Sequence, residues 1–191
     1  MKRLKIAIFG NGAVGQPLGH VLTKAGHSIT YLDRNGNPVQ RIENDSFFNL
    51  ELILIDDHGQ TVVKQKTSLQ KVNQQHISSY DIIFITVGYI NIPNVAKIIK
   101  RKLGNVEKFP FLVFLENYYE PEKLFVFVFS DYPKTKLVFG IPDIISYRIE
   151  KCHTRALYPF CFILSNNQLV KAINDKHFRH NVKYPIFRAS I

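Results

Sequence analysis

The start of the chain changes from one hydrophobic period to another. Residues 4–9 form a short apolar run that ends at Gly10, which predicts a β-strand. After it, apolar side chains recur at the spacing of one helix face, and Gly26 then suits a helix C-cap; they are Val14, Leu18, Val21, Leu22 and Ala25. Residues 28–32 alternate as a second strand that ends at Asp33. The pattern predicts a strand–helix–strand unit.

The same alternation continues further along the chain. The segments "LELILI", 50–55, and "TVVKQKT", 61–67, are joined by "DDHGQ" and predict a β-hairpin with Gly59 at its turn. The continuous apolar run "DIIFITV", 81–87, is typical of a buried parallel strand. A helix follows, with Pro93 in its first turn, Gly104 at its end and an apolar face of Ile92, Val95, Ala96, Ile99 and Leu103. "FLVFL", 111–115, predicts another buried strand.

These elements predict an α/β fold of the Rossmann type: a doubly wound, mostly parallel sheet with helices on both faces and a β-hairpin insertion. "EKLFVFVFS", 122–130, is either a helix or a strand, because its composition and its place in the alternation disagree. "KLVFGIPDIISYRI" and "YPFCFIL" predict later strands. We expect residues 1–150 to form an NAD-binding domain and residues 151–191 to extend it, without a recognisable substrate domain.

The composition indicates a globular protein, because 46% of the 191 residues are hydrophobic and 21% are charged. The net charge of +10 is compatible with nucleic acid, an anionic membrane or a phosphorylated small molecule as partner. The densest basic cluster lies at a predicted helix end, where cations complement the helix dipole, and comprises Lys97, Lys100, Arg101 and Lys102. Without a nucleic-acid-binding signature beside it, this cluster does not favour a nucleic-acid partner.

The apolar segments are too short for a membrane partner or a secretory signal. None approaches the roughly 18–20 residues that span a bilayer, and the run after "MKRLK" lacks the length and cleavage site of a signal peptide. We therefore expect a cytoplasmic protein. In that compartment Cys152 and Cys161 would be reduced thiols, and with His153 they do not form a zinc-binding spacing, so we expect no metal.

The candidate chemistry lies in the glycine-rich turn after the first strand. Gly10, Gly12 and Gly15 form G-x-G-x-x-G between a predicted strand and a predicted helix, with Asn11, Ala13 and Val14 as the intervening residues. Gly10 permits the sharp turn, Gly12 lets the backbone approach a pyrophosphate, and Gly15 lets the helix pack close to the strand. The helix N-terminus then faces the phosphates. The alternative is a tight turn that binds no ligand.

The residues after the second strand bear on the choice of coenzyme. Asp33, 23 residues after Gly10, is placed to accept hydrogen bonds from the adenosine ribose. Its charge would repel a 2′-phosphate, so NAD is favoured over NADP. Arg34 opposes that preference, because an arginine accommodates the extra phosphate.

Two further strand ends are expected at the same edge of the sheet. Thr86, Val87 and Gly88 end one strand and would lie over the coenzyme. Glu116 and Asn117 end the next and would reach the nicotinamide half or the substrate. Asn117 is equally compatible with a turn or a helix cap.

Together, these stretches resemble the coenzyme-binding half of the mannitol-1-phosphate 5-dehydrogenase family and its long-chain polyol dehydrogenase relatives. The resemblance covers residues 1–150 and rests on "FGNGAVGQPLGHVLTKAGHSITYLDRN", the hairpin region, "DIIFITVGYINIPNVAKIIKRKLG", "LVFLENYYEP" and "FGIPDIIS". It implies NAD-linked interconversion of a sugar-alcohol phosphate and a ketose phosphate. It also implies that Asn117 stabilises the developing alkoxide during hydride transfer.

The chain also departs from that family. Ile144 follows Asp143 where relatives carry an arginine, and no segment resembles the helical domain that supplies the family's catalytic lysine. Neither Lys151 nor Lys171 has that context, so the resemblance implies a truncated enzyme or one completed by a partner chain, and a homo-oligomer is also possible. Activity of the chain alone would require another proton acceptor, for which the candidates are His153, His177 and His180.

Two alternatives remain open. One is a non-catalytic module or sensor that binds NAD(H). The other is an enzyme similar to ketopantoate reductase, a family that shares the glycine turn and favours NADP. That family follows its later strand with Asn-Gly, whereas this chain has Asn117-Tyr118.

Overall fold

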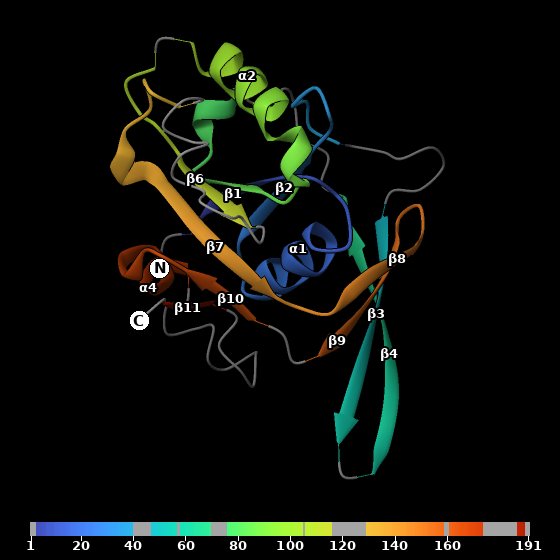
Figure 1. Cartoon of the computed structure of the whole chain (residues 1–191). Coiled ribbons are helices and arrows are strands. Elements are labelled where there is room, and N and C mark those ends of the chain that lie inside the picture. The colour runs from blue at the N-terminus through green and yellow to red at the C-terminus, as the bar shows by residue number, and fades with distance from the viewer. Residues whose placement is uncertain are drawn as a thin grey trace.

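The structure is a computed structural model, and it describes residues 3–39, 47–56, 58–69, 76–104, 106–115, 129–158, 161–173 and 187–189. In this part of the chain the strands form two sheets. Figure 1 shows the larger sheet with its helices and, beside α1, the smaller sheet.

The larger sheet has the strand order β11-β10-β7-β6-β5-β1-β2 in the described residues. Its five parallel strands are β1 (Lys5–Phe9), β2 (Ser28–Leu32), β5 (Ile82–Ile85), β6 (Phe111–Leu115) and β7 (Leu137–Asp143). β10 (Cys161–Leu164) runs antiparallel to β7, and β11 (Phe187–Ala189) pairs in parallel with β10. The strand order reverses at β1, because β2 pairs on one side of it and β5 on the other. In such sheets ligands bind at the carboxyl ends of the strands at this reversal.

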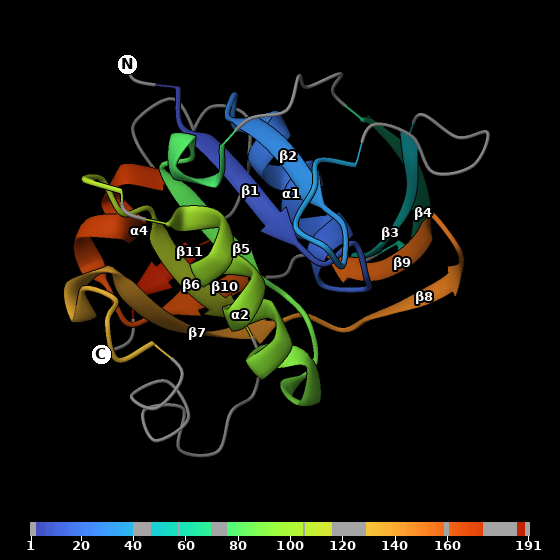
Figure 2. The same ribbon diagram turned by 90° about the horizontal axis from the view of Figure 1, so that it is seen from above.

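Helices cover both faces of the larger sheet (Figure 2). Along β1 the side chains alternate: Ile6 and Ile8 join the core beneath α1 (Gly15–Lys24), whereas Ala7 and Phe9 join the core beneath α2 (Ile92–Leu103). A strand buried on both faces reads as a continuous apolar run, which is why its sequence does not alternate. The short helix α4 (Asn167–Ile173) packs on the α1 side. The predicted Rossmann-type fold is confirmed.

The smaller sheet differs from the predicted hairpin insertion. The hairpin forms as expected, but it is joined by two strands from much later in the chain, in the order β4-β3-β9-β8. The strands are β3 (Phe47–Asp56), β4 (Gly59–Ser68), β8 (Ser146–Glu150) and β9 (His153–Tyr158). The segment "KLVFGIPDIISYRI" therefore divides into β7 and β8, which belong to different sheets. Most of "EKLFVFVFS" lies outside the described residues.

A buried hydrogen bond joins α1 to the smaller sheet. The Nδ1 atom of His20 lies 2.9 Å from the Oγ1 atom of Thr67 in β4. Both residues are buried, and burial together with the nearby Lys24 lowers the pKa of His20 to about 4. The folded protein thus favours the neutral imidazole.

This histidine should make stability depend on pH. The unfolded chain binds a proton at His20 near pH 6.5 and the folded protein only near pH 4, so stability is lost as the pH falls through this window. Between about pH 7 and about pH 5 the free energy of unfolding should fall by about 2 kcal/mol from this group. Urea titrations at both pH values should show a smaller fall for His20→Gln than for the wild type. Equal falls in wild type and His20→Gln would contradict the assignment.

Candidate functional site

The turn between β1 and α1 is held tightly against the end of β5. Gly10 has a φ of 116°, in the left-handed region that favours glycine. The hydroxyl of Thr86 donates to the carbonyl oxygen of Gly10 at 3.0 Å. A Cβ atom on Gly15 would overlap that same carbonyl oxygen. The structure therefore brings Gly10, Gly15 and Thr86 together at the strand reversal.

The N-terminus of α1 carries backbone N–H groups that have no hydrogen-bond acceptor among the described residues. The N-cap residue Val14 makes no side-chain capping bond, and the first turn contains no acidic residue. Among the described residues, none accepts a hydrogen bond from the N–H groups of Gly12, Ala13 or Val14. These three residues are partly exposed. Such N–H groups, with the positive end of the helix dipole, form an anion site.

There is free space beside Gly12 in the direction that a side chain would take. A Cβ atom placed there would meet one group within 4 Å, the guanidinium of Arg148, at 3.6 Å. Arg148 also donates from Nη2 to the carbonyl oxygen of Asn11 at 3.3 Å, and the Nε2 atom of Gln16 donates to the same oxygen at 2.8 Å. Sequence reasoning missed Arg148, because it lies 137 residues from Asn11 and belongs to no recognisable motif.

Asp33 lies at the same edge as the glycine turn, because the register pairs Phe9 with Leu32. Its Oδ1 atom accepts hydrogen bonds from the backbone N–H groups of Asn35 and Asn37, both at 2.8 Å. No described residue donates to Oδ2. Asp33 thus shapes its own turn through one carboxylate oxygen, while Arg34 beside it is exposed.

The other predicted strand-end residues are only partly described. Thr86 follows β5, Val87 packs against the core on the α2 side, and Gly88 precedes a single 3₁₀ turn, Tyr89–Asn91, that leads into α2. The remaining two, Glu116 and Asn117, lie outside the described residues, as do Tyr118, His177 and His180.

His153 lies in a charged cluster around Glu51, on the face of the smaller sheet that points away from α1. Its ring nitrogens are 3.2 Å from Glu51 and 3.4 Å from Glu150. The Nε atom of Arg155 donates to Glu51 at 2.7 Å, and this bond holds the pKa of the Glu51 carboxyl below its usual value. The cluster contains no residue of the glycine turn. Neither Lys151 nor Lys171 is buried.

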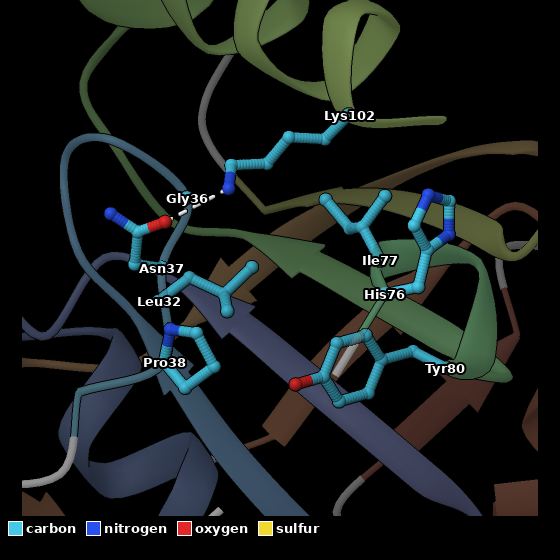
Figure 3. A pocket seen from close by; sticks show the side chains of 8 residues that line it. All are labelled: Leu32, Gly36, Asn37, Pro38, His76, Ile77, Tyr80 and Lys102. Carbon is cyan, nitrogen blue, oxygen red and sulfur yellow. Dashed lines mark hydrogen bonds between the residues drawn. The ribbon is translucent and has the colours of Figure 1, made fainter. Parts of the chain in front are cut away.

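A cavity of about 310 Å³ lies on the α2 side of β2 (Figure 3). The turn after β2, the segment 76–80 and α2 line it; the residues are Leu32, Gly36, Asn37, Pro38, His76, Ile77, Tyr80 and Lys102. The ammonium of Lys102 donates to the side-chain oxygen of Asn37 at 2.9 Å. The cavity shares the turn of Asp33, but none of its described lining residues belongs to the glycine turn. It is therefore separate from the glycine turn at the end of β1.

Among the described residues, no group of three or more His, Cys, Asp and Glu side chains could hold a metal ion. Cys152 and Cys161 are both buried thiols. No helix in the described ranges has the length and hydropathy required to cross a bilayer.

Comparison with known proteins identifies the family. The model of the family described as "Ketopantoate reductase PanE/ApbA" matches residues 6–160. The chain belongs to this family. It is also 28% identical over 114 residues to mannitol-1-phosphate 5-dehydrogenase of Thermoanaerobacter pseudethanolicus, a match that covers 55% of this chain and 29% of that protein.

Solved structures of several reductases and dehydrogenases share the fold. A 2-dehydropantoate 2-reductase from Geobacter metallireducens superimposes with a TM-score of 0.66 at 17% identity, over 98% of this chain and 58% of that chain. A dimeric ketopantoate reductase from Staphylococcus aureus gives 0.63 at 14% identity, over 98% and 55%. Octopine dehydrogenase, solved with NADH and L-arginine, gives 0.67 at 14% identity, over 98% and 48%. The chain thus spans about half to three-fifths of the length of these proteins.

Family membership changes the interpretation of the sequence resemblance. The polyol dehydrogenase match is a relation between Rossmann-type domains, and the family is the one that the sequence left as an alternative. Asn117-Tyr118 in place of Asn-Gly does not exclude the chain from it. The chain is a Rossmann-type dinucleotide-binding domain of an oxidoreductase family.

Proposed function

We propose that this chain binds a nicotinamide dinucleotide across the glycine turn, as the coenzyme domain of a reductase of the ketopantoate type. One observation carries the proposal: the backbone N–H groups of Gly12, Ala13 and Val14 have no hydrogen-bond acceptor among the described residues. They lie where the strand order reverses, in a chain of the PanE/ApbA family. Ligands of open α/β sheets bind at this position.

The residues of the turn fit the diphosphate of such a coenzyme. Gly10 and Gly15 keep α1 close to β1, and Gly12 leaves its open side to the phosphates. The helix N-terminus compensates their negative charge. When bound, the coenzyme supplies the hydride that reduces a carbonyl group. Asn117 is proposed to donate a hydrogen bond to the oxygen of that carbonyl as negative charge develops on it.

We propose NAD(H) as the preferred coenzyme. The Oδ2 atom of Asp33 is available to the ribose hydroxyls, and its charge disfavours a 2′-phosphate at the same place. Arg34 acts in the opposite direction, since its exposed guanidinium suits a phosphate.

Titration of NADH and NADPH into the chain tests both proposals. Asp33→Asn keeps an oxygen for the turn bonds to Asn35 and Asn37 but removes the charge. We expect it to weaken NADH binding by about tenfold, the value of one charge-assisted hydrogen bond, and to leave NADPH binding unchanged or stronger. Arg34→Ala should weaken NADPH alone. Failure of the wild type to bind either nucleotide would refute the coenzyme site, and a stronger affinity for NADPH would refute only the preference.

A polyol phosphate is the second candidate substrate, favoured by the 28% identity to mannitol-1-phosphate 5-dehydrogenase. An assay that follows nicotinamide absorbance distinguishes the two candidate reactions, with ketopantoate as substrate in one sample and mannitol 1-phosphate in the other. We expect turnover with ketopantoate from the protein that carries this domain. Turnover with mannitol 1-phosphate alone would support the second candidate, and tight binding without turnover of either would indicate a non-catalytic module.

A further inference from the structure

The smaller sheet contributes an arginine to the glycine turn. Arg148 in β8 pairs with Thr154 in β9, whereas its neighbour Tyr147 pairs with Arg155. Thr154 is fully buried, while Arg155 lies on the opposite face with Glu51. Side chains alternate along a strand, so Arg148 belongs to the face that packs on α1. From there its guanidinium reaches Asn11.

An irregularity in β8 coincides with this position. The pairing of β8 with β9 shifts register between Arg148 and Glu150. Such a bulge bends the strand locally and redirects the neighbouring side chains, and bulges are frequent next to functional sites. The bulge follows directly after Arg148, whose own pairing with Thr154 is regular, so β8 departs from regular pairing next to the residue that reaches the turn after β1.

The charge of Arg148 is not balanced by a described acidic residue. Its counterpart Arg155 binds Glu51 and also donates to the hydroxyl of Tyr147 at 3.0 Å. Arg148 makes no ion pair among the described residues, and its recorded bond is to a neutral carbonyl. A guanidinium has five N–H donors, so most of its donors remain available.

The bond to Asn11 can be given up at little cost. The same carbonyl oxygen accepts a shorter bond, 2.8 Å, from the buried side chain of Gln16. When Arg148 turns to another acceptor, the carbonyl keeps this donor. Among the described residues, the Arg148 guanidinium is the only group within 4 Å of the open side of Gly12. A ligand bound over Gly12 would therefore offer its acceptor atoms directly to this guanidinium.

We propose that Arg148 binds the diphosphate of the coenzyme from the side opposite the α1 N-terminus. This inference rests on the proposed function. The planar guanidinium donates two parallel hydrogen bonds to phosphate oxygens and adds a full positive charge, which a neutral loop cannot supply. The phosphates are then held between the N–H groups of residues 12–14 and the arginine. The smaller sheet therefore takes part in coenzyme binding by positioning a cation beside the glycine turn, residues 10–15, which contains none of its own.

The test compares the affinities of Arg148 variants of the full chain for NADH and NADPH. Arg148→Ala should weaken both nucleotides by the same factor, about tenfold or more, because both carry the same diphosphate. Its dissociation constant should also rise less steeply with salt, since one charge is removed. Arg148→Lys keeps the charge without the paired donors and should lie between Arg148→Ala and the wild type.

Arg101→Ala is the matched control, because it removes one exposed positive charge from the last turn of α2, on the face of the sheet opposite α1. It should leave both affinities unchanged. An Arg148→Ala protein that melts like the wild type and binds NADH equally well would overturn the inference and leave the proposed function standing. A loss confined to NADPH would place Arg148 at the 2′-phosphate and overturn it too. If the wild type binds neither nucleotide, both proposals fall.

Discussion

Gly12→Ala is expected to weaken NADH binding by about a hundredfold, because a methyl group over Gly12 would separate the diphosphate from the helix N-terminus and remove charge-assisted hydrogen bonds of about 1.5–3 kcal/mol each. The fold should tolerate this change. Among the described residues, a Cβ atom there meets only Arg148, at 3.6 Å, which is ordinary van der Waals contact. Gly12 is also not among the glycines with positive φ. The loss of binding should therefore occur without a loss of stability.

Fluorescence titration with NADH, together with thermal melting of the same samples, measures the two quantities separately. Gly12→Asp should reduce binding further, because it adds a negative charge beside the phosphates. A Gly12→Ala protein with wild-type affinity would show that no phosphate approaches this glycine. A large fall in melting temperature would instead show that the open side of Gly12 is needed for packing.

Gly15→Ala, unlike Gly12→Ala, should act on stability. We expect it to lower the free energy of unfolding by about 3 kcal/mol or more, at the upper end of the range for overpacking. The new Cβ atom would overlap the carbonyl oxygen of Gly10 and lie 2.8 Å from the hydroxyl oxygen of Thr86. Backbone at this junction has little freedom to move, because α1 packs directly on β1.

Urea unfolding at neutral pH measures this loss. Gly12→Ala is the matched control, since it makes the same chemical change three residues earlier in the same turn. Wild-type stability of Gly15→Ala would contradict the close approach of α1 to the end of β1. Gly15→Ala should therefore lose stability, whereas Gly12→Ala should lose coenzyme affinity.

The local elements of the larger sheet could be predicted well. β1, α1, β2, α2 and β6 each carry a hydrophobic period and end near a glycine or polar residue that marks the boundary. Strand β9 could not be predicted from the sequence, because "HTRALY" has no continuous apolar run. It is buried on one face only through the small residues Thr154 and Ala156, which pack beneath α1. Its sequence therefore lacks the signal that a fully buried strand gives.

The candidate site divides in the same way. Gly10, Gly12, Gly15 and Asp33 belong to one spacing pattern within a single strand–helix–strand unit, so sequence reasoning could group them. His153 was a candidate because histidine titrates near neutrality, but the structure places it with Glu51 and Glu150 instead. Strand pairing decides which residues surround His153, and the residue type alone does not indicate that pairing.

By itself, the sequence determined the strand–helix–strand unit and its glycine turn, because helix and strand periods and the steric needs of a tight turn act over a few neighbouring residues. Only the tertiary structure decided that β9 pairs in parallel with β3 and that β8 carries Arg148 to Asn11. Pairing between distant strands depends on backbone hydrogen bonds that every residue except proline can make, so it leaves no pattern of side chains in the chain itself.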